Sequence, residues 1–220
     1  VAIKPDFLPA QDALLRLELE QKRPEAALAI ARKMQSVHPP SPLGFDREGD
    51  IHLAQRRFLA AIAAYERAVE RGGGTPGLIK LHRALIAGGD ATTAERRLNE
   101  WLQQHPADVQ ARIYAAEVYA QTRRIREAIG QYETLLRTSP DNVVALNNLA
   151  ALYHREQDAR ARETAELAFK QGPHYPLVQD TLGWILVEQA QLPRGLDLLA
   201  RAAKAARSEE HTSELQSPCN

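Results

Sequence analysis

A short segment near the middle of the chain, residues 128–140, has the sequence AIGQYETLLRTSP. Its small and apolar side chains stand at positions 128, 132 and 135, a spacing that places them on one face of an α-helix. Pro140 ends the segment, and because proline lacks a backbone N–H and clashes with the preceding turn, it stops a helix. The segment therefore predicts one amphipathic helix with a defined end.

The same spacing recurs along the 220 residues. The first position repeats at intervals of 34, 33, 34, 33 and 34 residues, at Ala27, Ala61, Ala94, Ala128, Ala161 and Gly195. The third position holds Met34, Ala68, Trp101, Leu135, Ala168 and Ala202. A fixed period of this size is typical of repeat arrays. The small first residue allows two helices to cross closely, and the larger ones fill the groove against the next unit.

A second helical segment precedes each of these helices, with a short turn between the two. Its paired small or apolar positions are Leu14-Leu15, Glu48-Gly49, Leu81-His82, Ala115-Ala116, Leu149-Ala150 and Leu182-Gly183. Polar residues at the packing positions, such as Glu18, Glu48 and His52, make the front helices of the first two units weak matches to the repeat pattern. After the second unit, Gly72-Gly73-Gly74 takes the place of proline, and we expect it to end a helix with extra backbone freedom.

The unit resembles the tetratricopeptide repeat, whose pattern is W-x2-L-G-x2-Y, then A-x3-F, then P. The sixth unit carries the front of this pattern at residues 182–186, and the fourth carries its back at residues 128–140. The resemblance implies an all-α fold, a right-handed α-α superhelix (TPR solenoid) of about six helix-turn-helix units. The expected units of this solenoid, residues 1–206, are approximately 8–41, 42–74, 75–108, 109–142, 143–175 and 176–206.

The last residues, 207–220, are similar to the translation of a common sequencing adapter, and they interrupt the sixth unit. We therefore interpret them as a non-native tail and exclude them from the fold, together with Cys219, the single cysteine. The chain begins at Val1 without an initiator methionine, so we interpret it as a fragment of a longer protein.

The composition argues against several classes of function. Lysine plus arginine and aspartate plus glutamate are both 28, so the strong basic excess of a nucleic-acid-binding protein is missing. No apolar run approaches the length of a membrane span. Histidines lack metal-ligand spacing, and no serine lies in a G-x-S-x-G elbow. We therefore predict no enzyme activity, cofactor, metal, nucleic-acid partner or membrane insertion by this segment, and leave the oligomeric state open.

A protein or peptide partner is expected instead, in the groove that the first helix of each unit lines. Carried over from the family, the predicted partner-binding residues are Arg83, Glu117, Asn147, Asn148, His154, Asp180 and Trp184. Adjacent asparagines can bond an extended peptide backbone, although they can equally be ordinary repeat positions. Trp184 is either an anchor exposed in the groove or a residue packed against a missing C-terminal helix. We expect Asn147 and Trp184 to belong to one groove.

The last two units also resemble a narrower group. Residues 145–150 (ALNNLA) and 180–187 (DTLGWILV) are similar to the C-terminal repeats of the PEP-CTERM/exosortase-system lipoprotein PrsT. This resemblance implies a scaffold in a bacterial envelope, exopolysaccharide or protein-sorting assembly, periplasmic or associated with the outer membrane. Two alternatives remain: a soluble cytoplasmic adaptor or co-chaperone-like module, and the regulatory region of a larger enzyme.

Overall fold

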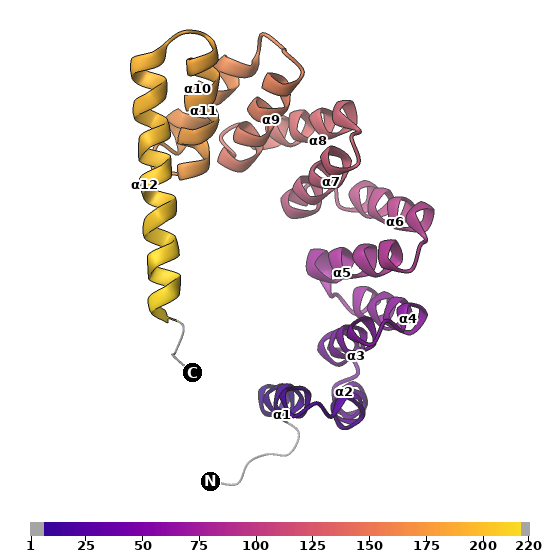
Figure 1. The fold of residues 1–220 in the computed structure, drawn as a ribbon. Coiled ribbons are helices and arrows are strands. Elements are labelled where there is room, and N and C mark those ends of the chain that lie inside the picture. The colour runs from indigo at the N-terminus through magenta and orange to yellow at the C-terminus, as the bar shows by residue number, and fades with distance from the viewer. Residues whose placement is uncertain (1–6, 217–220) are drawn as a thin grey trace. The chain divides into compact units, whose positions relative to one another are not determined.

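The computed structural model describes the backbone of residues 7–216 and the side chains of residues 7–207. Within that part of the chain it contains twelve α-helices and no strand, so the predicted all-α fold is confirmed. The helices follow one another along the chain in pairs (Figure 1). Their bounds are α1 Leu8–Glu20, α2 Pro24–Val37, α3 Leu43–Ala54, α4 Phe58–Glu70, α5 Gly74–Ala87, α6 Ala91–Gln104, α7 Val109–Gln121, α8 Ile125–Thr138, α9 Val143–Arg155, α10 Ala161–Gln171, α11 Pro176–Glu188 and α12 Leu192–Gln216.

The chain forms two compact units, Val1–Ala111 and Arg112–Asn220, with the boundary in the first turn of α7. In the first unit each helix from α1 to α6 packs against the next one. In the second unit α8 to α12 do the same, and α9 also contacts α11. Each unit is therefore a stack of helix pairs, in which a helix buries its apolar face against its neighbours.

The column of small residues lies at the crossings within the helix pairs. All five of its alanines are buried. In the last pair, a Cβ on Gly195 would lie 2.9 Å from the backbone oxygen of Gly183, and a Cβ on Gly183 would lie 2.8 Å from Leu199 Cγ. The crossing of α11 and α12 therefore leaves no room for alanine, which explains the glycine in the sixth copy.

A left-handed residue recurs in the turn within each helix pair. These residues are Lys22, Arg56, Gly89, Arg123, Gln157 and Ala190, with φ between 55° and 86°. Only the third is a glycine, although left-handed backbone costs other residues about 1–2 kcal/mol. The turns therefore share one backbone geometry, and most of them adopt it without the residue best suited to it.

The triple glycine ends α4 as expected. Gly72 and Gly74 both have positive φ, 79° and 59°, and α5 begins at Gly74. At the start of α6 a side chain caps the helix: Asp90 Oδ1 accepts a hydrogen bond from Thr93 N at 3.0 Å. These local contacts satisfy backbone groups that a helix end leaves unpaired.

In the weak front helix of the second repeat, α3, the polar Glu48 has partners on α2. Glu48 Oε2 accepts a hydrogen bond from Gln35 Nε2 at 2.7 Å, and Glu48 Oε1 lies 3.3 Å from Arg32 Nε. The neighbouring Gly49 lies against the ring of the buried Tyr65, which leaves no space for a Cβ. A glutamate in a packing column is therefore held by hydrogen bonds across α2 and α3.

The last helix, α12, continues past residue 206 to Gln216. A helical backbone does not reveal where a sequence came from, so the exclusion of residues 207–220 stays a prediction. Cys219 lies outside the described residues.

Candidate functional site

The predicted partner-binding residues lie on the first helices of the pairs, as the repeat register requires. Arg83 is on α5, Glu117 on α7, Asn147, Asn148 and His154 on α9, and Asp180 and Trp184 on α11. The α9 and α11 residues belong to one compact unit, and these two helices are in contact. They form the best-defined part of the predicted site.

A cavity of about 260 Å³ opens between α9 and α11. We call it the α9–α11 cavity, and its main lining side chains are Val144, Asn147, Asn148, Tyr175, Leu177 and Val178. Two of the seven predicted residues, Asn147 and Asn148, therefore share its wall with apolar side chains.

Asn147 is the unusual residue of this wall. Its side chain is buried, with 7% of the residue exposed. Asn147 Nδ2 donates to Asn148 Oδ1 at 3.4 Å, but Asn147 Oδ1 has no hydrogen-bond partner within the described residues. A buried oxygen without a donor costs about 1–3 kcal/mol. A ligand N–H would supply the donor that this amide lacks.

Asn148 has a firmer position. Its Nδ2 donates to the phenol oxygen of Tyr132 on α8 at 2.9 Å. Burial raises the pKa of the Tyr132 phenol above its ordinary value. Asn148 therefore ties α9 to α8 and orients its neighbour Asn147, rather than presenting a free amide.

Apolar side chains complete the cavity. Leu177 is 74% exposed, and Val144 and Tyr175 are each about half exposed. Tyr175 was not among the residues predicted from the sequence; it precedes Pro176 at the start of α11 and lies over Gly172. An aromatic residue directly before a helix-starting proline was the available signal, because it sits at the helix end that faces the cavity.

Trp184 lies outside this cavity. It is 52% exposed and stands seven residues after Leu177, on the same face of α11. The following helix α12 packs on Gly183 and does not cover the indole. Near it, His154 Nε2 lies 3.5 Å from Glu188 Oε2 and links α9 to α11. We call the surface that α9 and α11 form the α9–α11 face. Asn147 and Trp184 both belong to it, but only Asn147 lines the cavity.

The remaining predicted residues are exposed. Asp180 lies on α11 between Leu177 and Trp184. Arg83 belongs to the other compact unit, where burial and the Arg83 charge together lower the pKa of His82. Arg83, Glu117 and Asp180 do not line the α9–α11 cavity.

The first unit carries charges at the positions of the two asparagines. In the repeat register, Asp12 and Asp46 correspond to Asn147, whereas Arg47 and Lys80 correspond to Asn148. Lys80 Nζ lies 2.7 Å from Asp46 Oδ2, and Arg47 bonds Asp12 across α1 and α3.

Asp50 completes these contacts. It accepts from Lys80 at 2.9 Å, from Arg47 at 3.3 Å and from the hydroxyl of Tyr65 at 2.8 Å. The Arg47 hydrogen bond lowers the pKa of Asp12. We call Asp12, Asp46, Arg47, Asp50 and Lys80 the α1–α3–α5 charge network.

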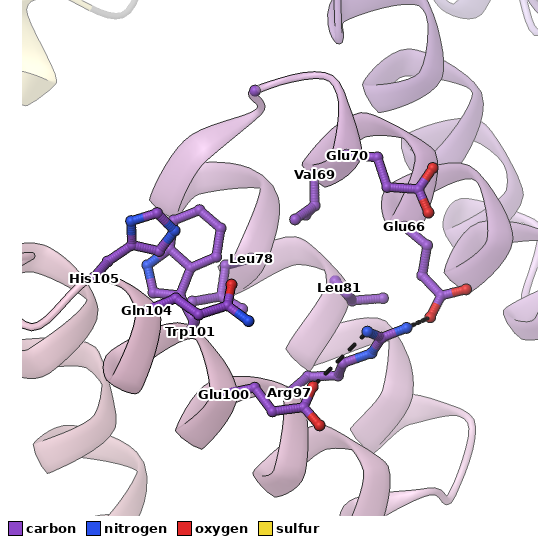
Figure 2. A pocket seen from close by; sticks show the side chains of 11 residues that line it. Glu66, Val69, Glu70, Leu78, Leu81, Arg97, Glu100, Trp101, Gln104 and His105 are labelled. Carbon is purple, nitrogen blue, oxygen red and sulfur yellow. Dashed lines mark hydrogen bonds and ion pairs between the residues drawn. The ribbon is translucent and has the colours of Figure 1, made fainter.

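A second cavity, of about 410 Å³, lies in the first unit among α4, α5 and α6. We call it the α4–α6 cavity. Figure 2 shows Trp101 and His105 at one side of it and Glu66 and Glu70 at the other, with Leu81 between them. No residue predicted from the sequence as a binding residue lines it.

Among the residues that the structure describes, no three histidine, cysteine, aspartate or glutamate side chains come together as a metal site. None of the helices searched in that part of the chain is both long and apolar enough to cross a membrane. The absence of a metal or cofactor stays a prediction.

Comparison with known proteins supports the repeat assignment. Tetratricopeptide-repeat family models match residues 47–77 and 85–153, so these two stretches are similar to tetratricopeptide repeats. The cytochrome c-type biogenesis protein CycH of Rhizobium meliloti (strain 1021) is 29% identical over 137 residues. That match covers 60% of this chain and 36% of CycH, so the chain spans about a third of this relative.

Solved structures support the fold alone. Yeast Tom70 gives a TM-score of 0.67 at 16% identity, over 86% of this chain and 41% of Tom70. A tetratricopeptide repeat protein from Parabacteroides merdae ATCC 43184 gives 0.57 at 18% identity, over 96% of this chain and 84% of that one. Tetratricopeptide-repeat proteins generally mediate protein–protein interactions and are generally not catalysts.

Proposed function

We propose that this chain is a non-catalytic scaffold that binds a partner peptide on the α9–α11 face. An extended segment places an apolar side chain in the α9–α11 cavity, against Val144, Tyr175 and Leu177. A backbone N–H of the segment donates to Asn147, and Trp184 packs against the segment further along α11. The observation that carries this proposal is Asn147, which lines a mainly apolar cavity and whose buried amide oxygen has no partner among the described residues.

The surrounding chemistry supports a peptide rather than a hydrocarbon partner. An apolar cavity with one unsatisfied polar group binds ligands that combine apolar surface with a matching donor. A rigid, half-exposed tryptophan is a favourable anchor, because it contributes a large contact area and loses little conformational entropy. A peptide backbone with a leucine-like side chain provides both features.

The site can be tested with a model peptide that carries leucine at alternate positions. In a Trp101→Phe background Trp184 is the only tryptophan, so its emission reports binding on α11. We expect a saturable emission change, and about fivefold weaker affinity after Asn147→Ala, because one net hydrogen bond is lost. Gln121→Ala, an exposed amide at the end of α7, is the matched control. Unchanged affinity in an Asn147→Ala, Trp184→Phe double variant, measured by calorimetry, places the partner elsewhere.

Two assemblies are candidates for the biological setting. The similarity to CycH supports a part in cytochrome c-type biogenesis, and this is the setting we favour. The ALNNLA and DTLGWILV segments support the second, an exopolysaccharide or protein-sorting scaffold of the PEP-CTERM type in the periplasm or at the outer membrane. In either setting we propose a protein partner and no nucleic acid.

Disruption of the gene in its own host separates the two settings. The first predicts loss of covalently bound haem in c-type cytochromes, measured by haem staining, with normal surface polysaccharide. The second predicts the reverse. Complementation with the Asn147→Ala variant then tests whether the phenotype depends on the α9–α11 face.

A further inference from the structure

Trp101 differs in burial from the other residues at its repeat position. The other five members of that column, Met34, Ala68, Leu135, Ala168 and Ala202, are all buried. Trp101 is only partly buried, because an indole does not fit where the repeat has small or slender side chains. Its ring instead lines the α4–α6 cavity.

The indole is held in place by neighbouring groups. Trp101 Nε1 donates to Asp108 Oδ2 at 2.9 Å, and the Trp101 ring lies 4.1 Å from the His105 ring, centroid to centroid. Asp108 Oδ1 also accepts from Ala111 N at 3.0 Å, so the carboxylate is fixed to the start of α7. Trp101 is therefore a rigid aromatic wall, which binds an apolar side chain with little further ordering cost.

Part of the cavity wall is apolar, and charged and polar side chains complete the lining. Val69, Leu78 and Leu81 line it together with Trp101. At its rim Gly72 stands where a Cβ would meet nothing within 4 Å. The volume of about 410 Å³ lies within the range of ligand-binding clefts. The cavity therefore has room for a leucine- or phenylalanine-sized side chain.

Charged side chains stand around the rim of the cavity. Arg97 pairs with Glu66 and also approaches Glu100, at 3.9 Å. Glu70 is different: its side chain is 71% exposed, and the cation within reach is its neighbour Arg71 at 4.0 Å.

Arg71 is largely engaged elsewhere. Its Nε donates to the Pro39 carbonyl at 3.1 Å, and its guanidinium lies 4.3 Å from the centroid of the Phe45 ring. The carboxylate of Glu70 is therefore available at the rim, and it complements a cationic group.

From these contacts we propose that the α4–α6 cavity is a second, separate binding site. It takes a basic amphipathic segment of a partner protein, in which a leucine or phenylalanine is flanked by lysine or arginine. The apolar side chain lies between Trp101 and Leu81, and a flanking cation pairs with Glu70. This site is on other helices and in the other compact unit from the α9–α11 face, so it does not depend on the proposed function above.

The two tryptophans of the chain allow a direct test. In a Trp184→Phe variant, Trp101 is the only emitter. The probe is a dodecapeptide with Lys-Leu-Phe-Lys at its centre and glycine and serine on both sides. We expect a saturable blue shift of the Trp101 emission, and binding that weakens as salt is added. Peptides with Glu-Leu-Phe-Glu or Lys-Ser-Ser-Lys at the centre should bind at least tenfold more weakly.

A matched pair of variants tests the charge. Glu70→Gln should weaken binding of the basic peptide about threefold, the size of one exposed ion pair. Glu25→Gln should leave it unchanged, since Glu25 is equally exposed, at 72%, and lies 3.6 Å from Arg57, away from the cavity.

Three results overturn the proposal. The first is no change in Trp101 emission up to millimolar basic peptide. The second is equal affinity for the basic and acidic peptides. The third is concentration-dependent self-association of the unliganded chain that Glu70→Gln abolishes, since the occupant is then a second copy of this chain.

Discussion

The first helices of the two compact units use the same repeat positions in opposite ways. In the first unit these positions hold the α1–α3–α5 charge network, whose acids and bases pair across neighbouring helices. In the second unit, α9 holds Asn147 and Asn148 at these positions, beside apolar side chains that remain exposed. The backbone arrangement is alike, but the charges at these positions of the first unit are paired, whereas the buried Asn147 Oδ1 of the second unit has no partner among the described residues.

This difference affects how much a ligand could gain by binding to each face. A face whose polar groups are paired with one another offers few contacts that a ligand could improve, because binding would first break existing ion pairs. A face with an unpaired buried oxygen and exposed apolar surface gains from a ligand on both counts. A few substitutions in two columns therefore change these first-helix positions from paired charges to an amide whose oxygen has no partner among the described residues.

The largest change in stability is expected when the α9–α11 face receives the carboxylate that the first unit has at the same position. Asn147→Asp places a carboxylate in a mainly apolar cavity, so its folded pKa should lie above its unfolded value. Destabilisation should be absent below about pH 4, grow as pH rises toward the folded pKa, and reach about 2 kcal/mol at neutral pH.

Hydrogen exchange of the α9 amides against pH measures this effect locally. The reciprocal change, Asp46→Asn in the same column, is the control and should cost under about 1 kcal/mol, because its pair is partly exposed. A larger cost for Asp46→Asn than for Asn147→Asp would contradict the comparison.

A smaller effect is expected when the charge network is opened. Arg47→Ala removes the hydrogen bonds to Asp12 and Asp50 and should cost about 1.5 kcal/mol at neutral pH. Since Arg47 lowers the folded pKa of Asp12 below its unfolded value near 3.8, this contribution is present above that value. It is lost as pH falls through the lower folded pKa.

Urea unfolding of both proteins at pH 7 and at the lowest accessible pH measures the change. Arg16→Ala, an exposed arginine 2.8 Å from the same aspartate, should cost far less. A cost for Arg47→Ala that does not shrink with acid would rule out Asp12 as its main partner.

The smallest effect concerns the turns, which the two units share. Gly89 and Gln157 occupy the same left-handed position, with φ of 86° and 55°. Gln157→Gly should relieve strain and stabilise the second unit by about 0.5 kcal/mol, whereas Gly89→Gln should destabilise the first by about 1 kcal/mol. Thermal melts of the two variants test this, and shifts of the same sign would disprove a common turn geometry.

Much of the fold was predictable from local signals. The 33- or 34-residue period, the small residues at the helix crossings and the stops at proline or glycine located the helix pairs without reference to distant contacts. Each of these signals acts within one pair of neighbouring helices. The polar residue Glu48 weakened the pattern because its partners, Gln35 and Arg32, lie on another helix, α2.

The candidate site was predictable only in part. The register placed Asn147, Asn148 and Trp184 on the α9–α11 face, but it did not separate the cavity wall from the residues beyond it. It gave no sign of Tyr175, which is outside the repeat columns, nor of the α4–α6 cavity. Trp101 looked like a packing residue because a column records position and not side-chain volume.

The sequence by itself determined the helical repeat, its period and the residues that face the first-helix surface, because these follow from spacing along a single chain. Only the tertiary structure decided which polar groups on that surface are paired. Asp46 meets Lys80, and Asn147 Oδ1 meets no donor among the described residues, because the neighbouring repeats supply different side chains. Whether a polar group finds a partner depends on the side chains that neighbouring repeats bring to it, and packing in three dimensions decides those contacts.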